Sequence, residues 1–410
     1  MKANLSQFRM RFREISRTSL NSDFKYKSIF LIFSILSLLV RFRLTWRNDT
    51  RNFSIENFRI VSDAGNFDLG SWFIIMKSFE SGKTPWDSGR YNYGPSWGAL
   101  LWLVDKISFD NFQARLLIVL ILFLFDLATA LILVKFNKRI LAVLYLLNPI
   151  SLTISGYHNQ IETSAIFFVL LSIYIYSNQA AKGDSNKRIW IVAVLIGISL
   201  TFKHSFFILP IWLALRESKI VARLIFLIVP YLIFIVSFLP FWGQSNTAII
   251  QNVIRYRSYQ NFPLYANFFD LTKVDLVYFN LTFVLGLIAL GFLARKYSPL
   301  NSLALLSISI VALAPSIANQ YLVLAAFGAI LIGGRISYFF LFLATLFLCK
   351  NPDGLGIPQF GFVNISYSLL ALVLFCMIIN FFRNLPGVKL DLKKNDQIFT
   401  GENSKNTLSF

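Results

Sequence analysis

Two acidic residues, Asp63 and Asp68, lie five positions apart in the segment SDAGNFD and are the first candidates for chemistry. A carboxylate beside a membrane-embedded cleft can take a proton from an acceptor hydroxyl, which typically raises a rate about 10²–10⁴-fold. The alternative for Asp68 is a helix N-cap. A helix lying on the membrane is predicted from four apolar residues at helical spacing: Phe67, Trp72, Ile75 and Phe79.

A second group of polar side chains lies in the segment NPISLTISGYHNQIET, in a very short turn between two apolar stretches. Its members are His158, Asn159, Gln160 and Glu162. A pH sensor and a metal ligand are both open roles for His158, one of only two histidines in the chain. One His beside one Glu does not make a metal site, however. No metal site is therefore predicted in this turn.

Basic residues at the ends of apolar stretches are candidates for contacts with a phosphate. The segment TFKHSFFILP puts Lys203 and His204 at such an end, where the lysine either snorkels or binds a lipid-linked phosphate. Arg41 and Arg43, in the last turns of the first stretch, either snorkel to the headgroups or meet a phosphate.

Asp126 lies mid-way along an apolar stretch, where an unpaired carboxylate costs about 2.5–3.5 kcal/mol. It must be protonated, paired or facing a polar cavity, and we favour a structural role between helices.

Aromatic side chains with flat faces suited to stacking on a sugar ring occur at Tyr91 and Tyr93, in the segment SGKTPWDSGRYNYGPSW. The alternative is that they anchor the chain at a membrane interface. Further along, the segment APSIANQYL adds Asn319, Gln320 and Tyr321, which we expect on the same side of the membrane.

The composition shows which class of protein positions these residues. Of 410 residues, 56% are hydrophobic and only 14% are charged, with a mean hydropathy of +0.61. Soluble domains carry about a quarter charged residues, so an ordinary soluble enzyme is excluded. The net charge of +19 would suit nucleic acid, but the basic residues cluster between long apolar stretches, as in membrane proteins that follow the positive-inside rule. We expect an all-α polytopic membrane protein in contact with membrane lipid and no nucleic-acid partner.

About twelve transmembrane helices are predicted, since each needs about 20 mostly apolar residues. The predicted spans are 28–46, 116–134, 140–156, 161–177, 189–203, 205–216, 223–242, 275–293, 299–315, 320–334, 337–349 and 365–382. The first is interpreted as a retained signal anchor. Basic connections at 135–139, 181–188 and 216–223 are predicted to be cytoplasmic. By alternation, 47–112, 157–160, 203–205, 243–274 and 316–320 face the other side.

The chain divides into a basic cytoplasmic arm (1–27), a transmembrane catalytic domain (28–382) and a basic cytoplasmic tail (383–410) that is predicted to be disordered. Within the domain, 47–112 forms one large external loop carrying amphipathic interfacial helices. The apolar stretch Trp97–Val104 belongs to this loop, because as a helix it would rise only about 12 Å. Counting it as a span would also move the basic 135–139 connection outside.

The order of these features resembles the GT-C superfamily of polytopic glycosyltransferases, and within it the GPI mannosyltransferase I type. The resembling pieces are GKTPW, YNYGPSW, FDLATALILVKF, NPISLTISGYHNQIE, FKHSFFILP and NQYLVLAAF. They cover about 60–215, with one further piece near 315–325. No single piece is specific; the order and spacing carry the resemblance.

The resemblance implies an inverting transfer of a hexose, mannose by default, from a polyprenyl-phosphate donor to a hydroxyl of a glycan or lipid acceptor, outside the cytoplasm. The family's Asp-x-Asp element falls on Asn66-Phe67-Asp68, so Asp68 matches as the base, with Asp63 as its competitor. Lys203 matches a phosphate contact, and His204, Arg41 and Arg43 join it on the donor side. The sugar and acceptor contacts are expected from Tyr91, Tyr93, His158, Asn159, Gln160, Glu162, Gln320 and Tyr321. No cofactor is predicted, and a divalent cation stays open.

A multi-pass lipid or glycan transporter or flippase is the main alternative, because it would share the span count, the intramembrane carboxylate and the proline-kinked helices. A non-catalytic assembly protein is a third. The concentration of polar groups at the outer ends of the spans favours the enzyme.

Overall fold

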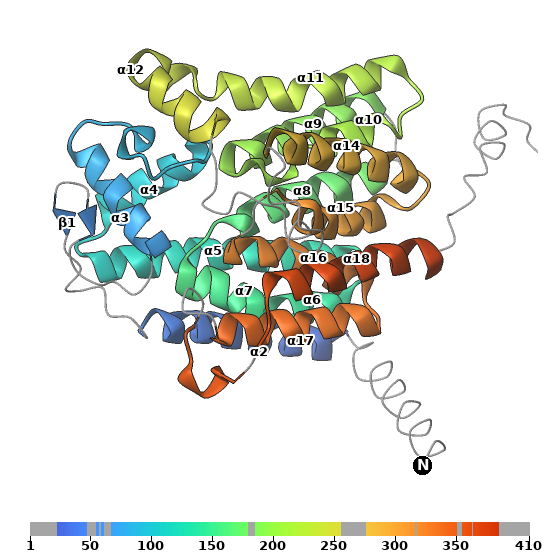
Figure 1. The fold of residues 1–410 in the computed structure, drawn as a ribbon, viewed down its shortest axis with the longest axis horizontal. Helices are drawn as coiled ribbons and strands as arrows, with labels where there is room; N and C mark the ends of the chain where they lie inside the picture. The colour runs from blue at the N-terminus through green and yellow to red at the C-terminus, as the bar shows by residue number, and fades with distance from the viewer. Residues whose placement is uncertain are drawn as a thin grey trace, which may run out of the picture.

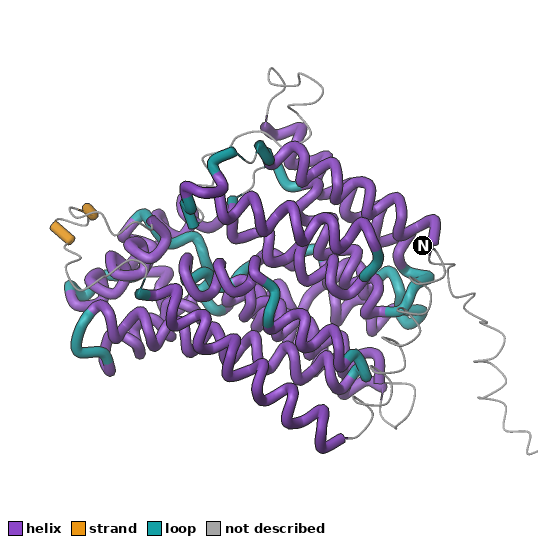
Figure 2. The backbone as a smooth tube through the Cα atoms, turned by 90° about the horizontal axis from the view of Figure 1, so that it is seen from below, coloured by secondary structure: helices purple, strands orange, loops and turns teal. Residues whose placement is uncertain are grey.

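The computed structural model shows a bundle of helices that run along the long axis of the molecule (Figure 1). The two strands, β1 (Ile55–Glu56) and β2 (Arg59–Ile60), form an antiparallel pair at one end of this bundle (Figure 2). The structure describes residues 23–46, 55–56, 59–60, 67–178, 185–255, 276–315, 318–350, 355–362 and 364–384.

The helices follow the apolar stretches of the sequence closely. Their bounds are α2 Asp23–Thr45, α3 Phe67–Glu80, η1 Pro85–Ser88, α4 Pro95–Ile107, α5 Asn111–Lys135, α6 Arg139–Leu146, α7 Pro149–Thr153, η2 Ile154–His158, α8 Glu162–Ser177, α9 Ser185–Phe202, η4 His204–Phe206, α10 Leu209–Ala214, α11 Ile220–Val236, α12 Leu239–Ile249, η5 Ile250–Ile254, α14 Leu276–Ala294, α15 Pro299–Leu313, η6 Asn319–Tyr321, α16 Leu322–Ile332, α17 Arg335–Lys350, η7 Pro358–Phe360 and α18 Tyr367–Asn384. Every predicted span coincides with one or more of these helices, so the predicted helical fold is confirmed.

Three helical segments of the described chain are long and apolar enough to cross a membrane: Tyr26–Thr45, Asn111–Lys135 and Arg139–His158. A fourth is obtained if α11 and α12 count as one span, although the two are bent by 83°. Several other apolar helices are shorter, with 10–17 residues. The total of twelve crossings therefore stays a prediction.

Two predicted spans differ from the structure. The stretch 223–242 is not one helix, because α11 ends at Val236 and α12 starts at Leu239. Pro240 lacks the backbone N–H that would continue the first helix, and it lies in the first turn of α12, where a proline is tolerated. The stretch 205–216 contains only the six-residue α10, preceded by the short turn η4.

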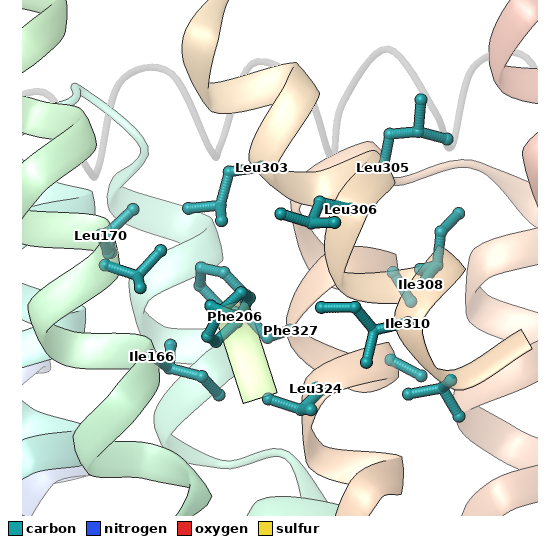
Figure 3. Packing of buried hydrophobic residues seen from close by; sticks show 14 of the residues in the cluster. Ile166, Leu170, Phe206, Leu303, Leu305, Leu306, Ile308, Ile310, Leu324 and Phe327 are labelled. Carbon is teal, nitrogen blue, oxygen red and sulfur yellow. The ribbon is translucent and has the colours of Figure 1, made fainter. Parts of the chain in front are cut away.

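Apolar side chains fill the centre of the bundle. Ile166 and Leu170 of α8 meet Phe206 of η4, Leu306 of α15 and Phe327 of α16 (Figure 3). Close packing of this kind fixes how far each helix is rotated about its axis, and hence where the polar residues at its ends lie.

The surface of the bundle carries continuous apolar faces on several helices. On α11, exposed apolar residues recur along its length at Ile220, Val221, Leu224, Leu227, Ile228, Leu232, Ile235 and Val236. On α2 the corresponding residues are Leu31, Ile32, Ile35, Leu36 and Leu39. Apolar surface of this extent is typical of helices that face lipid or another protein.

The described part of the loop predicted to be external contains the helices α3 and α4, but α3 does not offer its apolar face to a membrane. Trp72 and Ile75 are buried in a cluster with Trp86, Trp97 and residues of α5, so this face packs on protein instead of lipid. The spacing of apolar residues predicts a buried face without specifying what covers it. In α4, Trp97 is buried whereas Trp102 is half exposed.

Candidate functional site

The segments that alternation assigns to the external side meet at one end of the bundle. Figure 1 shows α3, α4 and α12 gathered there. Thr84, before η1, donates a hydrogen bond of 2.7 Å to Ser245 of α12. Asp87 accepts hydrogen bonds from the same serine at 2.9–3.0 Å, so η1 is tied to α12. The helices α3, α4 and α12 and the turn η1 thus converge at this end.

A buried ion pair between Lys203 and Glu162 is the centre of this region. Glu162 is the first residue of α8 and is fully buried, and Lys203, directly after α9, is 4% exposed. The Lys203 Nζ atom lies 4.9 Å from the ring centroid of Tyr93 and 5.0 Å from that of Tyr321. A cation over aromatic faces is stabilised by their quadrupoles. Residues of three other segments therefore surround one ammonium group.

Local backbone geometry brings both charges to this point. Lys203 takes an extended conformation (φ −150°, ψ 127°) that ends α9 before η4 begins. Its backbone N–H still donates to the carbonyl of Ser199 at 2.9 Å. Glu162 lies in the first turn of α8, where the helix dipole favours a negative charge. The second carboxylate oxygen of Glu162, Oε2, has no hydrogen-bond partner among the described residues.

Gln160 extends the centre toward the aromatic residues. The Tyr93 hydroxyl donates a hydrogen bond of 3.1 Å to Gln160 Oε1. Both side chains are nearly fully buried. Tyr93, Gln160, Glu162, Lys203 and Tyr321 are therefore brought together by direct contacts, although they come from distant parts of the chain.

Asn159 fixes the turn that leads into this centre. Its backbone is left-handed (φ 59°, ψ 37°) after the π-helical turn η2, a conformation that asparagine tolerates better than most residues. Its side-chain amide donates to the carbonyls of Ser155 at 3.1 Å and Gly156 at 3.3 Å. Its own backbone carbonyl accepts a hydrogen bond of 2.9 Å from the indole of Trp72 in α3. The turn is thus joined to the helix that carries Asp68.

Arg115 holds the same turn from α5, and the sequence reasoning missed it. Its guanidinium donates to Asn159 Oδ1 at 3.2 Å, to the carbonyl of Thr45 at 2.8 Å and to that of Tyr157 at 3.2 Å. The side chain is fully buried. It escaped notice because the predicted span starts at 116, so that Arg115 counted as a flanking residue. A basic residue directly beside a predicted span was the available signal.

A second buried ion pair lies deeper in the bundle. The Arg41 guanidinium donates to Asp126 Oδ2 at 2.7 Å, and both side chains are fully buried. Tyr145 donates to Asp126 Oδ1 at 2.6 Å, and Arg41 Nε donates to Ser155 Oγ at 2.8 Å. Of the three states left open for Asp126 (protonated, paired or facing a polar cavity), the structure shows the paired one. The expectation that Arg41 snorkels to headgroups is wrong, because its guanidinium is buried in this ion pair. Its contact with a phosphate stays a prediction. Arg43 is exposed.

Tyr91 is also placed differently from the expectation of a free sugar-stacking face. Its ring is 1% exposed and packs against Trp86 and Tyr93. Its hydroxyl donates to the Gly94 carbonyl at 2.5 Å and accepts from the Gly98 N–H at 2.6 Å. Burial raises the pKa of this phenol well above its usual value, so the hydroxyl stays neutral. Tyr91 therefore holds the turn before α4.

The remaining predicted site residues lie as follows. His158 is buried at the end of η2, and His204 begins η4 beside Lys203. Gln320, which lies between Asn319 and Tyr321 in the sequence, is partly buried. Asp68 is the second residue of α3, and Asp63 lies outside the described residues.

A cavity of about 440 Å³ lies between α3, the end of α4 and the start of α5. It is lined by Phe73, Met76, Lys77, Glu80, Asp105, Ser108, Phe109, Asp110, Asn111 and Ala114. Within the described residues, no three His, Cys, Asp or Glu side chains are grouped so that they could hold a metal ion.

Comparison with known protein families, with curated proteins and with solved structures found no match.

Proposed function

We propose that this chain is a multi-pass membrane glycosyltransferase that moves a hexose, mannose as first candidate, from a polyprenyl-phosphate donor to a hydroxyl acceptor on a glycan or lipid. The observation that carries the proposal is the buried Lys203 ammonium, which is held among Glu162, Tyr93 and Tyr321 at one end of the bundle. A buried cation with aromatic and amide neighbours offers a phosphate contact beside faces suited to a sugar.

In the proposed reaction the acceptor oxygen attacks the anomeric carbon of the hexose from the side opposite the phosphate. The bond between that carbon and the phosphate oxygen breaks, and its electron pair leaves with the polyprenyl phosphate. Lys203 stabilises the charge on this leaving group. The acceptor proton passes to a carboxylate, for which Asp68 is the first candidate and Asp63 the second. One displacement of this kind inverts the anomeric configuration.

The contacts of α3 support Asp68 as the base. Asp68 lies four residues before Trp72, one helical turn, so the two backbone positions share a face of α3. The Trp72 indole is bound to the carbonyl of Asn159, which is followed by Gln160 and Glu162. The start of α3 is therefore held against the turn that enters the Lys203 centre.

The two ends of the bundle differ in a way that supports the proposed orientation. At the end away from Lys203, Arg139 lies 5.0 Å from the ring of Tyr26, and Arg216 donates to Ser302 at 2.9 Å. These basic residues belong to the connections that the positive-inside rule assigns to the cytoplasm. We propose that this end, with both termini, is cytoplasmic and that the Lys203 centre faces outward.

The experiment is a transfer assay with purified protein in detergent, polyprenyl-phosphate hexose and candidate acceptors. Wild type is expected to transfer the sugar, and Asp68→Asn to lose about 10²-fold or more of the rate, as expected when a general base is removed. Asp63→Asn is tested in parallel, because Asp63 takes the role if Asp68→Asn stays active. Full activity of both variants would show that neither carboxylate is the base.

A lipid or glycan transporter is the second candidate. The 83° break between α11 and α12 favours it, since broken helices often form transport sites. Protein in vesicles that moves polyprenyl-phosphate hexose between leaflets, without transferring the sugar, would support this alternative and contradict the enzyme.

A further inference from the structure

We propose that Glu162 is a built-in competitor for the anion site at Lys203: the donor phosphodiester binds by displacing the Glu162 carboxylate from the ammonium. This inference rests on the proposed function, in which the anion is the phosphodiester of a lipid-linked sugar. It adds a role for Glu162 at the same site: the Glu162 carboxylate competes with the donor and thereby lowers donor affinity.

Within the part of the chain that the structure describes, three groups face the Lys203 ammonium. An ammonium group has three N–H donors. Glu162 Oε1 accepts one, and the rings of Tyr93 and Tyr321 cover two further directions at 4.9 and 5.0 Å from Nζ. Lys203 is also only 4% exposed. An incoming phosphate oxygen must therefore take the position that the carboxylate oxygen occupies.

Charge balance supports an exchange of one anion for the other. Glu162 and Lys203 are buried together, and an unpaired charge in such an interior is strongly unfavourable. A phosphodiester carries one negative charge, as the carboxylate does, so replacing one by the other keeps the ammonium paired. Simple addition would hold both anions against one cation, whereas exchange separates them, so that the Glu162 carboxylate must be stabilised elsewhere.

The first turn of α8 can stabilise the released carboxylate. Glu162 is the first residue of α8, and the N-cap residue is Ile161, whose side chain offers no hydrogen-bond acceptor. The N–H groups of a first helical turn and the helix dipole stabilise a carboxylate at this position. Oε2 of Glu162 also has no partner among the described residues before any exchange.

The test measures binding of polyprenyl-phosphate hexose in detergent to wild type and to Glu162→Gln, by native mass spectrometry and by the shift in Tm. Without ligand, Glu162→Gln is expected to have a lower Tm than wild type, since Lys203 loses its counter-ion. With the donor, it is expected to bind about tenfold tighter and to gain more in Tm. Lys203→Gln is expected to lose the binding in both backgrounds.

Two further variants keep the outcome decisive. Glu217→Gln is the matched control, because Glu217 also accepts a side-chain hydrogen bond, from Tyr176 at 2.7 Å, at the opposite end of the bundle. It is expected to leave donor affinity unchanged. Glu162→Asp keeps the charge with a shorter reach, so its affinity should lie between wild type and Glu162→Gln. This variant decides the question if Glu162→Gln does not fold.

Donor affinity in Glu162→Gln that equals or falls below the wild-type value would overturn the competition. Phosphatidylglycerol, also a phosphodiester, tests the source of the anion. If it binds with the same Lys203 dependence and the same gain in Glu162→Gln, the competition stands, although the site then takes membrane lipid and the transfer proposal loses its support. If wild type transfers sugar while Glu162→Gln and Glu162→Asp bind the donor as wild type does, the enzyme stands and the competition fails.

Discussion

The indole Nε1 of Trp72 donates a hydrogen bond of 2.9 Å to the backbone carbonyl of Asn159. This bond joins α3, whose second residue is Asp68, to the turn that leads into Glu162. Asn159 is in turn held by Arg115, which also binds the carbonyl at the end of α2. The helix that carries the proposed base is thus bonded to the turn that leads into Glu162, the ion-pair partner of Lys203.

Replacing Trp72 by phenylalanine tests whether this bond positions α3 for catalysis. The change removes one N–H donor and keeps an aromatic ring in the core. We expect kcat of sugar transfer to fall about tenfold or more, because small displacements of reacting groups are costly, while KM for the donor changes little. Steady-state kinetics with polyprenyl-phosphate hexose gives both constants.

Trp97→Phe is the matched control for that variant. Trp97 is buried in the same cluster, but its indole nitrogen has no hydrogen-bond partner within the described chain. The two variants therefore lose similar volume and differ in one hydrogen bond, which contributes about 1 kcal/mol to stability. Equal kcat values for Trp72→Phe and Trp97→Phe would contradict a positioning role for the Trp72–Asn159 bond.

Arg115 should be sensitive to conservative replacement. Its guanidinium donates to three acceptors in different directions, and a lysine ammonium cannot reach all of them from one position. We expect Arg115→Lys to lower the Tm clearly in a thermal unfolding scan. Arg188→Lys, at a partly exposed arginine, should leave it nearly unchanged. Equal Tm values for both variants would show that the three contacts do not stabilise the turn.

The Arg41–Asp126 ion pair should behave as a coupled buried pair. Asp126→Asn leaves a buried guanidinium without its counter-ion and is expected to reduce the free energy of unfolding by about 3–5 kcal/mol. The double variant Arg41→Met with Asp126→Leu should be more stable than the sum of the single changes predicts.

Asp105→Asn provides the comparison for the buried pair. Asp105 lies 3.6 Å from Lys106, whose side chain is half exposed, and such pairs contribute about 0–1 kcal/mol. Denaturant unfolding of wild type, Asp126→Asn, Asp105→Asn, Arg41→Met, Asp126→Leu and the double variant measures these differences. Additive effects of the Arg41 and Asp126 changes would argue against direct coupling.

The proposed orientation predicts which residues a membrane-impermeant thiol reagent reaches. In a variant without Cys349 and Cys376, a cysteine at Ser88 should be labelled from outside the cell. A cysteine at Asn137, which is exposed at the opposite end of the bundle, should react only after the membrane is opened. Labelling of position 137 from outside would invert the topology and place the Lys203 centre in the cytoplasm.

The helices could be predicted from the sequence because an apolar stretch is a local property. The break between Val236 and Leu239 was missed, although Pro240 was its signal. The surroundings of α3 could not be predicted, since apolar spacing is the same whether protein or lipid covers the face. Its buried Trp72 shows that protein does.

The sequence predicted many residues of the candidate site but not which of them pair with each other. Glu162 and Lys203 were both expected at the outer ends of spans, and Arg41 and Asp126 were both recognised as unusual. Which charge meets which depends on how each helix is rotated about its axis, and this rotation is set by packing between many similar apolar side chains. Arg41 pairs with a residue 85 positions away, so no local pattern predicts the contact.

The rate of hexose transfer by the variants Lys203→Met and Lys138→Met tests most directly the central claim that Lys203 binds the donor phosphate. Lys138 is exposed in a basic connection at the other end of the bundle. At a donor concentration below KM, we expect Lys203→Met to lose about 10²-fold or more of the rate, as for other groups that stabilise a leaving charge, while Lys138→Met stays close to wild type. A Lys203→Met protein that transfers sugar as fast as wild type would contradict the account.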